Sequence, residues 1–134
     1  MNNRYNRHNR RKYSLKVHIV LVTKYRKQLL IGSIADDVKQ KILDIANTRG
    51  YEIIAIETDK DHIHFLLSYD ITDRVCNIVK IVKQKTTYHL WQKYSSVLSK
   101  QYRKEKTFCS DGHFACSIGE VSSATIQKYI ESQG

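Results

Sequence analysis

The chain has 134 residues, of which 41% are hydrophobic and 27% are charged, so its size and composition are typical of one globular domain. Five glycines, no proline and three cysteines exclude a collagen-like repeat, a low-complexity chain and a fully paired disulfide scaffold. No apolar run approaches the roughly 20 residues of a membrane span, and no secretion signal opens the chain. We therefore expect one domain over residues 1–134, in the reducing cytoplasm and away from membranes.

Positive charge is concentrated in two segments. Lys and Arg outnumber Asp and Glu by 23 to 13, which gives a net charge of +10. Residues 1–28 hold nine of these cations and residues 80–106 hold eight, so the two segments carry seventeen of the twenty-three. Aromatic residues are interleaved with them, a mixture typical of proteins that bind single-stranded nucleic acid, although a solvated basic surface over core aromatics is the alternative. We predict phosphate contacts from the basic arm over residues 1–12 and from both segments, by Arg10, Arg11, Lys24, Arg26, Lys27, Lys83 and Lys85.

The first half of the chain predicts a strand, a helix and a hairpin. Residues 13–23 are rich in β-branched and aromatic side chains and predict a strand. Ser33 begins a pattern that resembles a capping box, and the helix that follows it ends at Gly50. Residues 51–58 and 62–69 are β-rich and flank a short polar turn, which predicts an antiparallel hairpin.

The second half predicts two more helices around one strand. Thr72 can cap a long helix that continues toward Trp91, and residues 95–107 are polar enough to predict a loop. Residues 108–118 predict a strand that breaks near Asp111 and Gly112, and a last helix begins near Ser122 or Ser123. The order β, α, β, β, α, β, α predicts an α+β fold of the ferredoxin-like or RRM-like type. Its antiparallel four-stranded sheet carries two helices on one face, and the last helix could lie on the other.

Two histidines are predicted to share the open face of the sheet. In the strand over residues 62–69, Ile63, Phe65 and Leu67 suit the face that packs on the helices, so His62 and His64 point the other way. Two imidazoles at this spacing can bind one metal ion, although the pattern also occurs by chance. His18 could face the same surface or pack in the core, and Asp61 serves the turn or hydrogen-bonds a histidine.

The last predicted helix contains a candidate nucleophile. Tyr129 and Gln133 are four residues apart and therefore lie on one helical face. A phenol with a pKa of about 10 is a poor nucleophile in water, yet it becomes competent beside a metal ion or a general base. The alternative is that Tyr129 packs with Ile126 and Ile130 in an apolar stripe, and spacing alone favours that role.

Four segments together resemble the small single-tyrosine transposases of the HUH group, which move prokaryotic insertion sequences as single-stranded DNA. These segments are Thr23–Lys27, Asp61–Leu66, Phe114–Gly119 and Tyr129–Gln133. The similarity covers nearly the whole chain from about Tyr13 onward. Each motif is short, and their order and separation make the combination specific.

The resemblance implies a reaction and a set of partners. His62 and His64 would bind Mg²⁺ or Mn²⁺, Gln133 would complete the protein ligands, and Tyr129 would form a 5′-phosphotyrosine on single-stranded DNA. DNA hairpins at the insertion-sequence ends would be the partner, in the prokaryotic cytoplasm beside the nucleoid. The active form would be a homodimer in which Tyr129 of one chain serves the histidines of the other. A structural zinc site with Cys109 and Cys116 is disfavoured because the Cys-x-x-Cys knuckle is missing.

Two other functions remain as alternatives. A non-catalytic RNA-binding module of the RRM type has the same topology and stacks bases on aromatic side chains of its central strands. The predicted open face of the third strand carries His62, His64, Leu66 and Ser68, which cannot form such a platform. A replication-initiator-like nickase would use the same HUH chemistry, but the short chain and the tyrosine near its end disfavour it.

Overall fold

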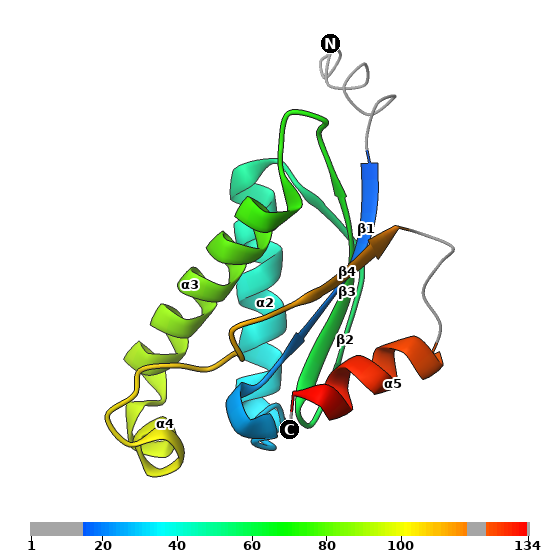
Figure 1. The fold of residues 1–134 in the computed structure, drawn as a ribbon. Coiled ribbons are helices and arrows are strands. Elements are labelled where there is room, and N and C mark those ends of the chain that lie inside the picture. Colours follow the sequence, from blue (N-terminus) through cyan, green and yellow to red (C-terminus); the bar gives the residue numbers. More distant parts are fainter. Residues whose placement is uncertain (1–14, 118–122, 134) are drawn as a thin grey trace.

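The computed structural model describes residues 15–117 and 123–133 and forms an antiparallel sheet with helices on both faces (Figure 1). Its strands are β1 (Leu15–Val22), β2 (Glu52–Asp59), β3 (His62–Tyr69) and β4 (Phe114–Ser117), in the order β2-β3-β1-β4. Each neighbouring pair is antiparallel. This is the predicted ferredoxin-like arrangement, with β1 and β3 in the centre. In the described part of the chain, no helix is both long and apolar enough to cross a bilayer.

The main core lies between the sheet and two long helices, α2 (Gly32–Arg49) and α3 (Val75–Lys93). Alternate residues of the central strands point into it, as period-two side-chain alternation requires. These are Val17, Ile19 and Leu21 from β1 and Ile63, Phe65 and Leu67 from β3, all at most 5% exposed. The other face of β3 is therefore free for the histidines, which confirms the predicted division of this strand.

The long helices begin differently from the prediction. Ile31 occupies the N-cap position of α2 and Arg74 that of α3, and neither helix has a side-chain cap hydrogen bond. Ser33 already lies inside α2, so the predicted capping box is wrong. Gly32 takes a φ of 56°, a left-handed conformation that glycine adopts readily, and this sharp entry replaces the cap. The predicted end of α2 is confirmed, because Gly50 follows its last residue with a φ of 84°.

The segment after α3 is helical, contrary to the predicted loop. Helix α4 (Ser95–Tyr102) follows α3 after Tyr94, and it buries Leu98 and Tyr102 against the main core. These two residues are four apart and share one face, but together with the exposed Val97 they give no recognisable helical period. The next strand is shorter than predicted: before β4 only an isolated bridge pairs Cys109 with Thr23.

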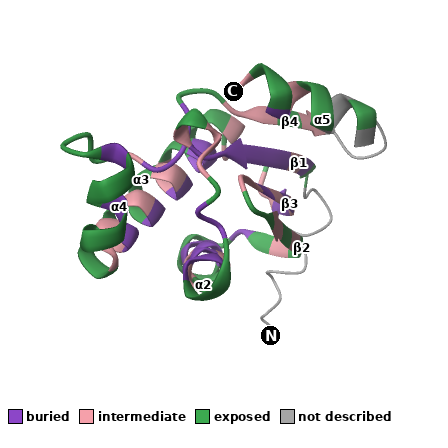
Figure 2. Ribbon diagram, turned by 90° about the horizontal axis from the view of Figure 1, so that it is seen from below, coloured by how far each residue is buried: buried purple, intermediate pink, exposed green. Residues whose placement is uncertain are grey.

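A short last helix, α5 (Ser123–Ser132), covers part of the other face of the sheet (Figure 2). Its Ile130 packs with Val20 and Val22 of β1, and Phe114 and Tyr129 lie partly buried around them. The last helix thus lies where the sequence suggested. The last helix begins at Ser123, one of the two predicted starts. The predicted basic arm, with Arg10 and Arg11, falls outside the described residues.

Candidate active site

A row of imidazoles occupies the open face of the sheet. His62 and His64 project from β3, and His18 projects from β1 beside them. The His18 Nδ1 and His64 Nε2 atoms are 3.0 Å apart, so one of the two nitrogens must carry the proton of a hydrogen bond. His18 therefore faces the open surface, which decides between the two roles that its sequence position allowed.

Asp61 orients the first histidine. Its Oδ1 atom lies 3.1 Å from His62 Nδ1, and because a carboxylate only accepts, the imidazole donates through Nδ1 and leaves Nε2 free. The other carboxylate oxygen accepts a hydrogen bond from Arg26 Nε at 3.2 Å. Burial alone would raise the pKa of Asp61, but the bonds from His62 and Arg26 outweigh it and hold the pKa below its ordinary value of 3.8. Asp61 does more than serve the turn, the role that its sequence position favoured.

The histidine pair suits a divalent metal. His62 presents a free Nε2, and the lowered pKa of His64 keeps its imidazole neutral near pH 7, the form that binds metal. Among residues 15–117 and 123–133, no three His, Cys, Asp or Glu side chains gather closely enough to hold an ion by themselves. Such an ion would take its remaining ligands from an amide oxygen, from water or from a bound substrate.

We expect His64 to make the stability of the protein depend on pH. Burial lowers its pKa below the ordinary value of 6.5, and His18 and His62 add to the shift while Glu57 opposes it. The unfolded chain then binds a proton where the folded chain does not, so the free energy of unfolding falls as the pH decreases from 6.5 toward the lowered pKa. Urea unfolding of wild type and His64→Gln across this range measures the effect. In the variant, the free energy of unfolding should depend less on pH over this range. An unchanged pH dependence would contradict its assignment to His64.

Tyr129 is held at the other side of β1. Its ring packs against Phe114 with 5.7 Å between ring centroids, and its hydroxyl lies 3.5 Å from the position a Cβ would take on Gly112. Within the described residues, neither this hydroxyl nor that of Ser110 has a hydrogen-bond partner. Burial raises the pKa of the Tyr129 phenol. The phenol is therefore protonated at neutral pH.

Lys83 fixes the segment against which Tyr129 rests. Its Nζ atom donates to the carbonyl oxygens of Ser110, Asp111 and Gly112 at 2.7, 2.9 and 2.8 Å. Three bonds use the three donors of an ammonium group. We call residues 110–112 with Lys83 the lysine clasp. A phosphate contact by Lys83, which the charge pattern predicts, would have to replace one of these bonds.

The other predicted phosphate contacts lie in two places. Lys24 and Arg26 are close to the site, where they pair with Asp111 at 3.4 Å and with Asp61 at 3.2 Å, and Lys27 follows them half-buried. Lys85 lies in a groove between α2 and α3, on the opposite side of the sheet from the histidines. The structure thus brings Lys24, Arg26 and Lys27 toward the site and separates Lys85 from it.

The amide groups of α5 differ in position. Gln133 follows the last residue of the helix. Its side-chain amide donates to the Ser132 hydroxyl, and its backbone N–H donates to the carbonyl oxygen of Ile130. Gln127, which sequence reasoning missed, lines a small cavity together with Asp61 and His62. Gln127 is two residues from Tyr129 and therefore lies on a different helical face. The four-residue spacing that indicated Gln133 does not apply to it.

Comparison with known proteins identifies the family. Residues 11–133 match the family described as transposase IS200 like, and the chain belongs to this family of transposases. It is 33% identical over 121 residues to the ISDra2 transposase TnpA of Deinococcus radiodurans, covering 90% of this chain and 85% of that protein. It is 28% identical over 122 residues to the IS200 transposase of Salmonella typhimurium, covering 91% and 78%.

Solved structures agree with this fold. A crystal structure of a candidate transposase from Deinococcus radiodurans superposes with a TM-score of 0.83 at 28% identity, covering 90% of this chain and 92% of that one. A REP-associated tyrosine transposase bound to a REP hairpin superposes with a TM-score of 0.57 at 13% identity, covering 87% and 62%. The second likeness concerns the fold alone.

Proposed function

We propose that this transposase cleaves and rejoins single-stranded DNA through a covalent bond to Tyr129. The observation that carries the proposal is the placement of two elements on one face of the sheet. Asp61 orients His62 beside His64, and α5 brings a partly buried tyrosine onto the same face. A membership in the IS200-like family supplies the reaction class, the breaking and joining of DNA.

The chemistry of the tyrosine is a transesterification. The Tyr129 oxygen attacks the phosphorus of the scissile phosphodiester as the bond from phosphorus to the 3′-oxygen breaks. The phenol loses its proton and the departing 3′-oxygen gains one, so a 5′-phosphotyrosine and a free 3′-hydroxyl result. Because one phosphoester replaces another, a second 3′-hydroxyl can reverse the step and join new ends. Positioning of the attacking oxygen in line with the leaving group is the main demand on the protein.

His62 and His64 are the residues that would hold a Mg²⁺ or Mn²⁺ ion, with Gln133 as the third protein ligand. When bound, such an ion polarises a non-bridging phosphate oxygen and neutralises developing charge. Asp61 keeps the His62 ring in the orientation that frees Nε2, and burial keeps His64 neutral. Gln127 already lines the cavity beside His62, so a comparison of Gln127→Ala with Gln133→Ala decides which amide the reaction uses.

We infer that the substrate strand carries hairpins. The REP-associated tyrosine transposase of similar fold is bound to a hairpin. In this chain Arg26 is linked to His62 through Asp61, and Lys24 pairs with Asp111 near Tyr129. Incubation with single-stranded DNA from the ends of the insertion sequence and Mn²⁺ should give a covalent adduct on a denaturing gel. Mass spectrometry should locate the phosphodiester-linked nucleotide on the tryptic peptide that contains Tyr129. An adduct that forms on a different peptide would refute the assignment.

We further propose a homodimer in which the tyrosine acts on the partner's site. In one chain the Tyr129 hydroxyl rests on Gly112, at the β4 side of the sheet, whereas the histidines lie on β3 with β1 between them. Mixed His62→Ala and Tyr129→Phe chains should then regain cleavage, because each heterodimer holds one intact site, whereas either variant alone is inactive. Inactive mixtures in which heterodimers are shown to form would mean that the tyrosine serves its own chain.

A further inference from the structure

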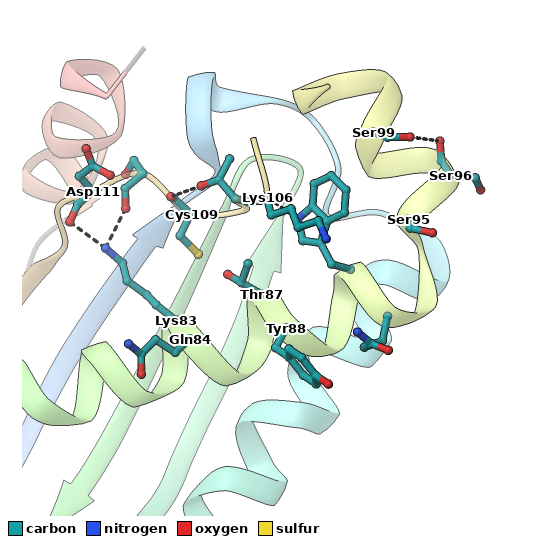
Figure 3. Close-up of a pocket in the computed structure, with 14 residues that line it drawn as sticks. Lys83, Gln84, Thr87, Tyr88, Ser95, Ser96, Ser99, Lys106, Cys109 and Asp111 are labelled. Atoms are coloured by element: carbon teal, nitrogen blue, oxygen red, sulfur yellow. Dashed lines mark hydrogen bonds between the residues drawn. The ribbon is translucent and has the colours of Figure 1, made fainter. Parts of the chain in front are cut away.

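A second concave site lies on the far side of the lysine clasp from Tyr129. A cavity of about 840 Å³ opens between α3, α4 and the segment over residues 106–111 (Figure 3). Its volume is in the range of ligand pockets. The side chains that line it include Gln84, Tyr88, Trp91, Gln92, Ser95 and Lys106.

Two aromatic rings face this cavity. Tyr88 and Trp91 are three residues apart on α3 and therefore lie on one side of the helix. Tyr88 is 69% exposed, which is a large fraction for an aromatic side chain. The Trp91 Nε1 atom donates to the carbonyl oxygen of Thr107 at 2.9 Å, which fixes the indole ring where part of it lines the cavity. Rigid, accessible rings of this kind are suited to stacking on a planar ligand.

The polar lining favours an anionic ligand with hydrogen-bonding edges. Lys106 is exposed at the cavity, and residues 80–106 hold eight cations against one acid, Glu105. The amides of Gln84 and Gln92 each offer donors and an acceptor. Together these groups match one unpaired nucleotide. The rings can stack on its base, the cation can bind its phosphate, and the amides can hydrogen-bond the edge of the base.

The lysine clasp lies between the cavity and the nucleophile. Ser110 and Asp111 form one wall of the cavity, and Gly112 contacts the Tyr129 hydroxyl on the other side. Lys83 itself lines the cavity beside Asp111 (Figure 3). Its ammonium group binds the carbonyl oxygens of residues 110–112. A nucleotide in the cavity would therefore lie against the same backbone segment on which the tyrosine rests.

We propose that this cavity binds an unpaired nucleotide of the single-stranded DNA substrate. The base stacks on Tyr88 and Trp91, and Lys106 contacts its phosphate. The inference rests on the proposed function only for the nature of the substrate. It assigns to α3 and α4 a part in choosing where the strand is cut.

The test uses a property of the whole chain: Trp91 is its one tryptophan, so emission excited selectively from tryptophan, and not from the nine tyrosines, reports on this cavity. Titration with oligo(dT) should quench or shift the emission, because a base stacks on the indole. An abasic deoxyribose-phosphate oligomer of equal length should bind through its phosphates and leave the emission unchanged. Equal responses to the two oligomers would overturn the proposal, and so would an emission change that follows protein concentration without DNA.

Variants separate stacking from charge. Tyr88→Ala should weaken oligo(dT) binding by about tenfold and Tyr88→Phe should not, because the ring and not the hydroxyl makes the contact. Lys106→Ala should weaken binding and reduce its salt dependence. Lys41→Ala removes a cation that lines a separate groove on α2, and it should change neither. Unchanged affinity in both Tyr88→Ala and Lys106→Ala would overturn the site.

The covalent adduct distinguishes this proposal from the reaction itself. If Trp91 responds to bases but no adduct forms at Tyr129 with any single-stranded DNA, the cavity stands and the proposed cleavage fails. If the adduct forms and Tyr88→Ala moves or broadens the cleavage position, both stand. If the adduct forms with wild-type affinity and position in Tyr88→Ala, the cleavage stands and the cavity proposal fails.

Discussion

Replacement of Tyr129 by Phe is expected to abolish the covalent protein–DNA adduct while DNA binding persists. The variant keeps the ring that packs on Phe114 and loses only the attacking oxygen. Loss of an essential nucleophile lowers turnover by on the order of 10⁴-fold or more. The hydroxyl is buried without a hydrogen-bond partner among the described residues, so its removal leaves no new group unpaired. The free energy of unfolding should therefore be unchanged or slightly higher.

Two measurements complete this prediction. Denaturing gels report the adduct, and urea unfolding reports the stability of the same preparation. Tyr51→Phe is the matched control, because Tyr51 is 9% exposed in the main core and lies outside the candidate site. It should form the adduct at the wild-type rate. An adduct in Tyr129→Phe would transfer the role to another tyrosine, with Tyr25 or Tyr88 next to be tested.

Loss of either strand histidine is expected to stop cleavage as completely as removal of the metal. His62→Ala and His64→Ala should each lower the rate by more than about 100-fold. Loss of a residue that only supports a metal ligand costs up to about 100-fold, and loss of the ligand itself should cost more. Asp61→Asn should lower it by about 10-fold to 100-fold, because the amide cannot orient His62 as a carboxylate does. Both histidines are only half-buried, so the fold should survive.

Treatment of the wild-type protein with EDTA should abolish cleavage as the histidine substitutions do. Added Mn²⁺ should restore cleavage by the wild type and by neither histidine variant. His89→Ala is the control, since His89 lies on α3 on the other side of the sheet from the pair. Single-turnover cleavage of DNA at fixed metal concentration is the measurement. Cleavage at the wild-type rate in EDTA, or in either histidine variant, would show that these residues do not hold a catalytic ion.

The fold was largely predictable because its signals are local and strong. The alternation of apolar and polar residues defined β3 as His62–Tyr69, and a glycine marked the end of α2. Helix α4 was not predictable, since its burial depends on two residues that meet the core only after α3 has turned the chain. The helix starts were also missed. Ile31 and Arg74 occupy these positions with exposed side chains, where propensity would favour a side-chain cap.

The site was predictable in its residue types and less so in its contacts. Strand period alone put His62 and His64 on one face, and the structure confirms that face. The roles of Asp61 and His18 depended on distances across strands, which no spacing along the chain contains. The same holds for the lysine clasp, because Lys83 appeared in the sequence as one more cation of a basic segment. The metal and the nucleophile remain predictions that the experiments above test.

The lysine clasp also bears on the order in which the protein folds. Lys83 and the carbonyl groups that it binds are 27 to 29 residues apart along the chain. Closing a loop of this length costs about 3 kcal/mol of conformational entropy, which only the docked α4 and the segment before β4 can offset. The clasp should therefore form late, after the hairpin that carries the histidines. A partly folded chain would then display the imidazoles without an ordered resting place for the tyrosine, and a nascent polypeptide could not attack DNA before its assembly is complete.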